Sequence, residues 1–144
     1  MSRKHDRPKI KSGPISNGKI PSPASPPPEK VNLSFEYYEP GGDFCLSRCS
    51  KDEIRGYKDC VRKLSSMEWN EVLRSSGKGE NKAGLAFTPY SDTALKGVTR
   101  PSRIDPGLQI CAVRASGKMR LFGFRIRQTY YILWYDRNHE IVPT

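Results

Sequence analysis

Three strand-like runs in the last 37 residues constrain the fold more than any other feature of the chain. The runs cover residues 108–114, 119–127 and 129–136, and they are rich in Val, Ile, Phe, Tyr and Trp. Such side chains suit the pleated, half-buried surface of a sheet. Ser116 and Gly117 supply a tight turn after the first run, and an Arg-Gln pair separates the second from the third. The pattern predicts a three-stranded antiparallel meander.

Positive charge is concentrated near the two ends of the chain. Of the formal net charge of +10, residues 1–30 contribute +5, residues 31–107 contribute +1 and residues 108–144 contribute +4. The basic side chains on the predicted meander are Arg114, Lys118, Arg120, Arg125, Arg127 and Arg137. A pI near 9.6 indicates a polyanionic partner, namely RNA, DNA or an acidic protein surface, with an anionic membrane as the weaker candidate. Because no apolar run reaches about 18 residues, we expect neither a membrane span nor a secretory signal.

The chain divides into a basic arm, residues 1–30, and a single domain, residues 31–144. The arm holds seven of the twelve prolines and almost no large apolar side chains, so it cannot bury enough surface to offset its ordering entropy. We expect it to be disordered or extended. It either lies along a nucleic acid or is a solvated tail without a specific partner.

The domain opens with a strand pattern followed by helix signals. Residues 31–38 alternate with period two, and residues 44–46 are a candidate partner strand. Ser50 and Glu53 form a capping box ahead of a helix whose apolar residues, at helical spacing, are Ile54, Tyr57, Val61 and Leu64. Ser65 and Glu68 are placed to cap a second short helix, which buries Trp69, Val72 and Leu73. The two helices are predicted to form an αα-hairpin.

These elements predict an α+β fold, in which a curved, mainly antiparallel sheet of about five strands packs on the αα-hairpin. Residues 75–106 are interrupted repeatedly by Gly and Pro, and only residues 85–87 resemble a strand. A loop of that length in a compact domain is either functional or wrongly assigned.

Known catalytic and cofactor motifs do not occur in the chain, so we expect no cofactor and no metal. The spacing of Cys45, Cys49 and Cys60 does not match the paired C-x2-C pattern of zinc sites. Reduced thiols in a cytoplasmic protein are the favoured interpretation, with Cys60 and Cys111 as small buried hydrophobes. Metal binding requires His139 to fold back onto Cys45 and Cys49.

Arginine chemistry is the more natural mechanism for this sequence. Arg125 and Arg127 are expected on one face of their strand, with Arg120 on the other. An arginine pair can hold a phosphate, and aromatic side chains such as Tyr131 and Tyr135 can stack on unpaired bases. The same groups serve RNA binding and metal-independent RNA cleavage. The candidate acid or base is His139, for which an ordinary turn residue is the alternative.

The succession of a strand, paired helices and an Arg-bearing meander resembles the small RelE/ParE-type toxins of bacterial toxin–antitoxin modules. That resemblance implies a compact α+β fold and, for the RelE branch, cleavage of messenger RNA in the ribosome. Carried over by position, it implies phosphate contacts from four arginines and an acid/base role for His139. Those arginines are Arg114, Arg120, Arg125 and Arg127.

The ending GFRIRQTYYILWYDRNHEIVP also resembles that of small, uncharacterised bacterial proteins with the form GFxIxxTYYIxWxDxxHxIxP. This second resemblance implies no activity. It implies that Trp134, Asp136 and His139 belong to one local unit, in which Asp136 bonds His139 or caps the turn.

Three functions follow as hypotheses. The first is a metal-independent, RelE-like endoribonuclease acting on RNA or the ribosome, with His139, Arg125 and Arg127 as catalytic residues. The second is a non-catalytic RNA- or ribosome-associated binding module. The third is an interaction module for an acidic protein such as an antitoxin. The nucleic-acid-binding candidates common to the first two are Arg114, Lys118, Arg120, Arg137, Tyr131 and Tyr135.

Overall fold

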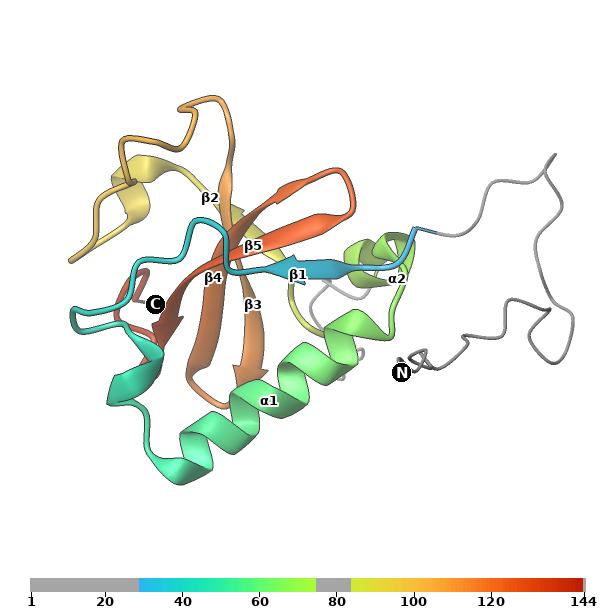
Figure 1. Cartoon of the computed structure of the whole chain (residues 1–144), viewed down its shortest axis with the longest axis horizontal. Helices are drawn as coiled ribbons and strands as arrows, with labels where there is room; N and C mark the ends of the chain where they lie inside the picture. The colour runs from blue at the N-terminus through green and yellow to red at the C-terminus, as the bar shows by residue number, and fades with distance from the viewer. Residues whose placement is uncertain (1–28, 75–83, 144) are drawn as a thin grey trace, which may run out of the picture.

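The computed structural model describes residues 29–74 and 84–143, and the predicted arm, apart from Glu29 and Lys30, lies outside them. Five strands form one open sheet in the order β1-β5-β4-β3-β2 (Figure 1). The strands are β1 (Asn32–Ser34), β2 (Thr88–Tyr90), β3 (Ile110–Ser116), β4 (Met119–Ile126) and β5 (Thr129–Asp136). Only β1 and β5 pair in parallel, and the other pairs are antiparallel. The predicted α+β fold with a mainly antiparallel sheet is therefore confirmed.

The predicted meander forms β3, β4 and β5, and two β-bulges modify its pairing. Between β3 and β4 the extra residue is Ala115, because Arg114 pairs with Arg120 while Ser116 pairs with Met119. Between β4 and β5 the extra residue is Leu133. A bulge increases local twist and changes where the following side chains point.

Gly123 lies beside the second bulge, where the backbones approach closely. A Cβ atom at this position would overlap the Tyr131 carbonyl oxygen and stand 3.1 Å from the Tyr130 ring. The Tyr130 hydroxyl donates hydrogen bonds to the Leu121 and Cys111 carbonyls, at 2.8 and 3.2 Å. Because residue 123 has no side chain, the buried Tyr130 ring can lie across the sheet and its hydroxyl can reach the two strand carbonyls.

Helix α1 (Lys51–Ser65) covers one face of the sheet and begins at the predicted capping box, in which Ser50 and Glu53 bond each other's backbone amides. Its buried residues are Tyr57, Cys60 and Leu64, whereas Ile54 is 42 % exposed. The second helix, α2 (Trp69–Arg74), is only six residues long. It buries Trp69 and Val72, but the predicted burial of Leu73 is wrong, since that side chain is 42 % exposed.

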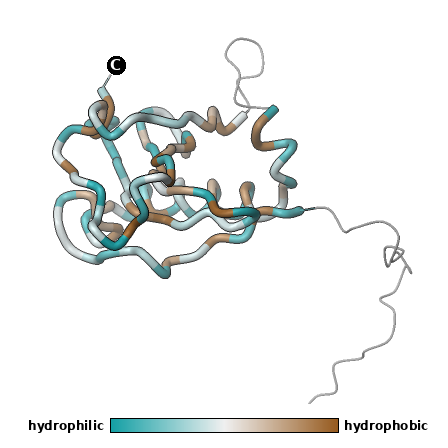
Figure 2. The backbone as a smooth tube through the Cα atoms, turned by 90° about the horizontal axis from the view of Figure 1, so that it is seen from above, coloured by the Kyte–Doolittle hydropathy of each residue, from teal (hydrophilic) through white to brown (hydrophobic). Residues whose placement is uncertain are grey.

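The opposite face of the sheet carries a second apolar cluster covered by loops rather than by a helix. Its fully buried members include Ile110, Phe122, Phe124 and Ile141. The sheet is therefore covered on both sides, and in Figure 2 hydrophobic and hydrophilic stretches follow one another along the backbone.

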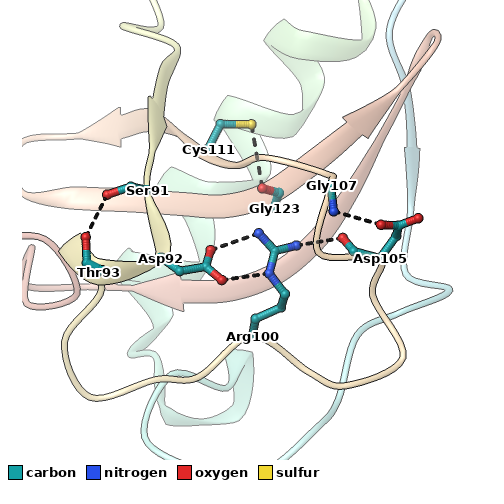
Figure 3. A network of polar contacts seen from close by, with 8 residues as sticks. All are labelled: Ser91, Asp92, Thr93, Arg100, Asp105, Gly107, Cys111 and Gly123. Atoms are coloured by element: carbon teal, nitrogen blue, oxygen red, sulfur yellow. Dashed lines mark hydrogen bonds and ion pairs between the residues drawn. The ribbon is translucent and has the colours of Figure 1, made fainter.

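Arg100 organises the loop layer between β2 and β3. Its guanidinium binds both carboxylate oxygens of Asp92, at 2.8 and 2.9 Å, and donates a third bond to the Asp105 carbonyl at 3.0 Å (Figure 3). Asp105 in turn accepts a hydrogen bond from the Gly107 amide. From Gly84 onward, the segment that sequence patterns left unreadable is an ordered cover of the sheet containing a short 3-10 helix, η2 (Asp92–Ala94).

Three short strand predictions are wrong in extent or place. The strand expected over 31–38 ends at Ser34, because the Tyr38 amide bonds the Phe35 carbonyl and turns the chain. Residues 44–46 form no strand and lead into the 3-10 helix η1 (Leu46–Arg48). The strand expected at 85–87 is β2, three residues later. Among the described residues, no helix is long and apolar enough to cross a membrane.

Candidate nucleic-acid interface

Arg114 and Arg120 lie directly opposite each other on β3 and β4, at the end of the sheet where these strands turn. Both side chains are on the loop-covered face of the sheet. Side chains two residues apart in a strand share a face, and Ala112 and Phe122 belong to the apolar cluster on that face. The bulge at Ala115 creates this pairing. A regular register extended from the Ser116–Met119 pair would have placed Arg120 opposite Ala115 and Arg114 opposite Leu121.

The two guanidiniums differ in how they are held. Arg120 donates to the carbonyls of Gly117, at 2.6 Å, and Met119, at 3.1 Å, and these bonds fix it against the turn. Burial and the charge of Arg114 lower the pKa of Arg120 below its usual value. Within the described part of the chain, the Arg114 guanidinium makes no hydrogen bond or ion pair.

Lys118 adds a third cation in the turn between β3 and β4, where Gly117 has a φ of +48°. The Lys118 side chain is exposed. Arg114, Lys118 and Arg120 are called the basic patch below. Like charges opposite each other in a sheet are destabilising, so an arrangement of this kind favours a bound anion.

His139 lies beside the basic patch, because β5 ends at Asp136, which pairs in register with Arg120, and His139 follows three residues later. Its backbone has a φ of +58°, and its Nδ1 atom is buried without a hydrogen-bond partner among the described residues. Partial burial of the ring and then the charge of Arg120 lower the pKa of His139, Lys118 acts in the same direction, and Asp136 opposes them. These influences favour the neutral imidazole at neutral pH.

Asp136 is fully buried and holds the segment that carries His139. Its two carboxylate oxygens accept hydrogen bonds from the backbone amides of Glu140, at 2.9 Å, and Ile141, at 2.8 Å. Of the two roles predicted for Asp136, the structure therefore shows the turn cap rather than a bond to His139.

The structure does not bring His139 together with Arg125 and Arg127. Arg125 lies near the far end of β4, and Arg127 follows that strand in the turn to β5, with a φ of +55° rather than the expected strand conformation. At about 3.3 Å per residue, Arg120, beside which His139 lies, is separated along the strand from Arg125 by roughly 17 Å. The proposed catalytic trio is thus split between opposite ends of one strand.

Arg125 is occupied by contacts within the fold. Its guanidinium stacks on the Trp69 ring, 4.1 Å from the centroid, and its Nε donates to the Arg127 carbonyl at 2.6 Å. The Trp69 indole N–H donates to the Gln128 carbonyl at 2.9 Å. Arg125 therefore joins α2 to the turn between β4 and β5.

Other predicted nucleic-acid contacts also have partners within the fold. Arg137 donates to the Arg48 carbonyl at 3.0 Å and approaches Glu53 at 3.7 Å. Tyr135 is only 3 % exposed and packs edge-on against Tyr57, which removes it from any surface. The half-buried Tyr131 stacks on a core phenylalanine on the loop-covered face.

Two half-buried aromatic side chains complete the surroundings of the basic patch. Trp134 pairs in register with Phe122, two residues from Arg120, and Tyr90 stacks on the same Phe122 ring. Tyr90 is close enough to Arg120 to influence its pKa. Sequence reasoning did not select Tyr90 as a site residue, because the strand that carries it was predicted three residues too early.

All four cysteines are free. Within residues 29–74 and 84–143, no three His, Cys, Asp or Glu side chains gather closely enough to hold a metal ion. Cys60 and Cys111 are buried as predicted, and burial raises the pKa of each thiol to about 12. Cys45 is buried too, but hydrogen bonds from the Ser47 and Tyr38 hydroxyls lower the pKa of its thiol to about 6.

Comparison of the chain with protein-family models, with curated proteins and with solved structures finds no match. The resemblance to RelE/ParE-type toxins and the resemblance of the C-terminal ending remain predictions. The function is therefore inferred from the geometry of the basic patch.

Proposed function

We propose that this chain binds RNA, and that the basic patch is where a phosphate of the RNA backbone docks. The observation that carries the proposal is the pair of like charges formed by Arg114 and Arg120, which the bulge at Ala115 sets opposite each other. In the free protein the two guanidiniums repel each other. A phosphate placed between them replaces that repulsion with two charge-assisted contacts.

The surroundings of the patch favour an unpaired strand over a duplex. Tyr90 and Trp134 are half-buried aromatic side chains on the same face as Arg120, and they offer ring surface on which a base can stack. Lys118, exposed in the turn, adds charge without fixed geometry. This combination of cations and aromatic rings is typical of sequence-tolerant binding to single strands.

Fluorescence anisotropy with a labelled single-stranded RNA tests the proposal. Arg114→Gln should weaken binding and reduce the salt slope by about one unit, which corresponds to one lost phosphate contact. Arg127→Gln is the matched control, because it removes the same charge at the opposite end of β4. Equal losses in the two variants would show that binding follows net charge and not the patch.

Metal-independent RNA cleavage is a second candidate, and the position of His139 favours it. A half-buried imidazole with a lowered pKa beside two arginines is suited to accept the proton of a 2′-hydroxyl. In this mechanism Arg120 and Arg114 stabilise the phosphate. The sequence predicts Arg125 and Arg127 as the catalytic arginines instead. Cleavage of a long RNA that survives EDTA and disappears in His139→Ala would support it, and intact RNA would reject it for RNA alone.

The remaining alternatives use the same charge. A ribosome-associated role requires cleavage or binding to appear only when ribosomes are added. An acidic protein partner predicts weak affinity for RNA at physiological salt in every variant. For each of the RNA-directed functions we propose a cytoplasmic location. The four cysteines are free, and thiols stay reduced in the cytoplasm.

A further inference from the structure

Positive charge exceeds negative charge in the group formed by His139, the basic patch and Asp136. Arg120 on β4 and Lys118 in the adjacent turn both oppose a positive charge on the imidazole, and Asp136 on β5 favours it. Arg114 on β3 and Tyr90 on β2 influence Arg120. The acid next to His139 in sequence is Glu140, whose side chain is exposed.

Asp136 cannot neutralise the group fully, because it supplies one negative charge against the three positive charges of the basic patch, and its two oxygens bond the backbone amides of Glu140 and Ile141. The free protein therefore holds three cations, one engaged carboxylate and an imidazole whose protonation would add a fourth positive charge. An anion bound at the patch compensates the positive charge of Arg114, Lys118 and Arg120. That positive charge then no longer opposes protonation of the His139 ring.

The two nitrogens of the His139 ring differ in their surroundings. Nδ1 is buried and unpartnered among the described residues, whereas Nε2 is not among the buried unpaired atoms. The φ of +58° and the Asp136 cap on the following residues fix the segment on which the ring stands. The protonated imidazole carries an N–H on both nitrogens, and one of them can be donated to an oxygen of a phosphate docked at the patch as a charge-assisted bond.

We infer that His139 is a proton-linked ligand of the RNA phosphate, neutral in the free protein and protonated when a phosphodiester occupies the basic patch. This inference rests on the proposed RNA binding at that patch and adds its regulation by pH. By linkage, a ligand that promotes protonation binds more tightly as the proton concentration rises. RNA affinity therefore increases as pH falls toward the acidic side of neutrality.

The test measures RNA affinity of the full chain between pH 5.5 and 8, using a single-stranded RNA with hydroxyl groups at both ends. Internal phosphodiesters carry a constant charge in this range, so the ligand itself does not titrate. The matched variant is His139→Asn, because asparagine does not titrate there and tolerates a positive φ better than most residues. The other histidine, His5, is retained in both proteins.

We expect the affinity of the unaltered chain to rise by about fivefold or more from pH 7.5 to 5.5, with a limit of about tenfold per pH unit for one proton. His139→Asn should change by less than about twofold over the same range. Calorimetry in two buffers with different ionisation heats should show proton uptake on binding in the unaltered chain and none in the variant. An equal pH response in both proteins would overturn the inference.

Failure of the inference is distinguishable from failure of the proposed function. If Arg114→Gln weakens binding more than Arg127→Gln while His139→Asn keeps the pH response, the patch binds RNA and His139 is not linked to it. If Arg114→Gln and Arg127→Gln weaken binding equally, the patch is not the binding surface and the inference falls with it.

Discussion

Replacing Arg114 by Gln should make the fold more stable while it weakens RNA binding. The perturbation removes one of two like charges that face each other across β3 and β4. Directly opposed residues have Cβ atoms about 5 Å apart, and the guanidinium charges are taken to lie at about 7 Å. With an effective dielectric constant of about 40–80, Coulomb's law gives a repulsion of about 0.6–1.2 kcal/mol.

Urea denaturation followed by circular dichroism measures this gain. We expect Arg114→Gln to raise the free energy of unfolding by about 0.5–1 kcal/mol at low salt, and the melting temperature by about 2–4 °C. The gain should disappear in about 1 M salt, where the screening length is about 3 Å. Comparing the two salt concentrations separates the charge effect from any loss of packing by the arginine stem.

Arg127→Gln again serves as the control, since Arg127 lies in the turn at the other end of β4 and has no like charge opposite it in register. Its stability should change by less than about 0.5 kcal/mol. Two results would refute the reasoning. One is a loss of stability in Arg114→Gln at low salt, and the other is a gain that persists unchanged at high salt.

Three further predictions concern the fold and its thiols. Gly123→Ala should cost about 3 kcal/mol or more in the free energy of unfolding, because the obstruction is a strand carbonyl that cannot move aside; a milder loss in chemical denaturation would contradict the predicted overlap. Ser50→Ala should cost about 1 kcal/mol through the lost cap, and Ser50→Gly should restore much of it. Ultraviolet absorbance of the thiolate, compared with a Cys45→Ser variant, should show Cys45 ionising with a midpoint near pH 6 although its side chain is buried, while Cys60 stays protonated; absence of this transition would contradict the prediction. Since this folded-state pKa lies below the unfolded value, the Cys45 thiolate contributes stability above about pH 8.5 that is lost as pH falls through about 6.

The parts of the fold that could be predicted are those with a local signal. The runs that form β3, β4 and β5 are long and rich in β-forming residues, and Ser50 with Glu53 marks the start of α1 within four residues. The loop layer has no such signal. It depends on Arg100 reaching Asp92, eight residues away, and no periodicity connects the two.

The candidate site was predicted by residue type but not by position. Arg114, Lys118, Arg120 and His139 were all selected from the sequence, yet their grouping depends on the bulge at Ala115 and on the Asp136 cap. A one-residue shift in register moves side chains to other partners, and nothing in the run from Arg114 to Arg120 signals the extra residue. Arg125 and Arg127 are predicted as a pair because alternation puts them on one face of a regular strand, and His139 is predicted by residue type alone; the length of β4 places the arginines away from the histidine.

The parallel pairing of β1 with β5 has a consequence for how the chain is made. Asn32 finds its partner, Thr129, only after almost the whole domain has been synthesised. Since chains emerge from the N-terminus first, β1 has no neighbour on the sheet until the last strand is complete. Closing so long a loop carries a large entropic cost before any contact repays it. We therefore expect the sheet to be completed only once β5 is available, and fragments that stop before β5 to stay unfolded and vulnerable to proteolysis.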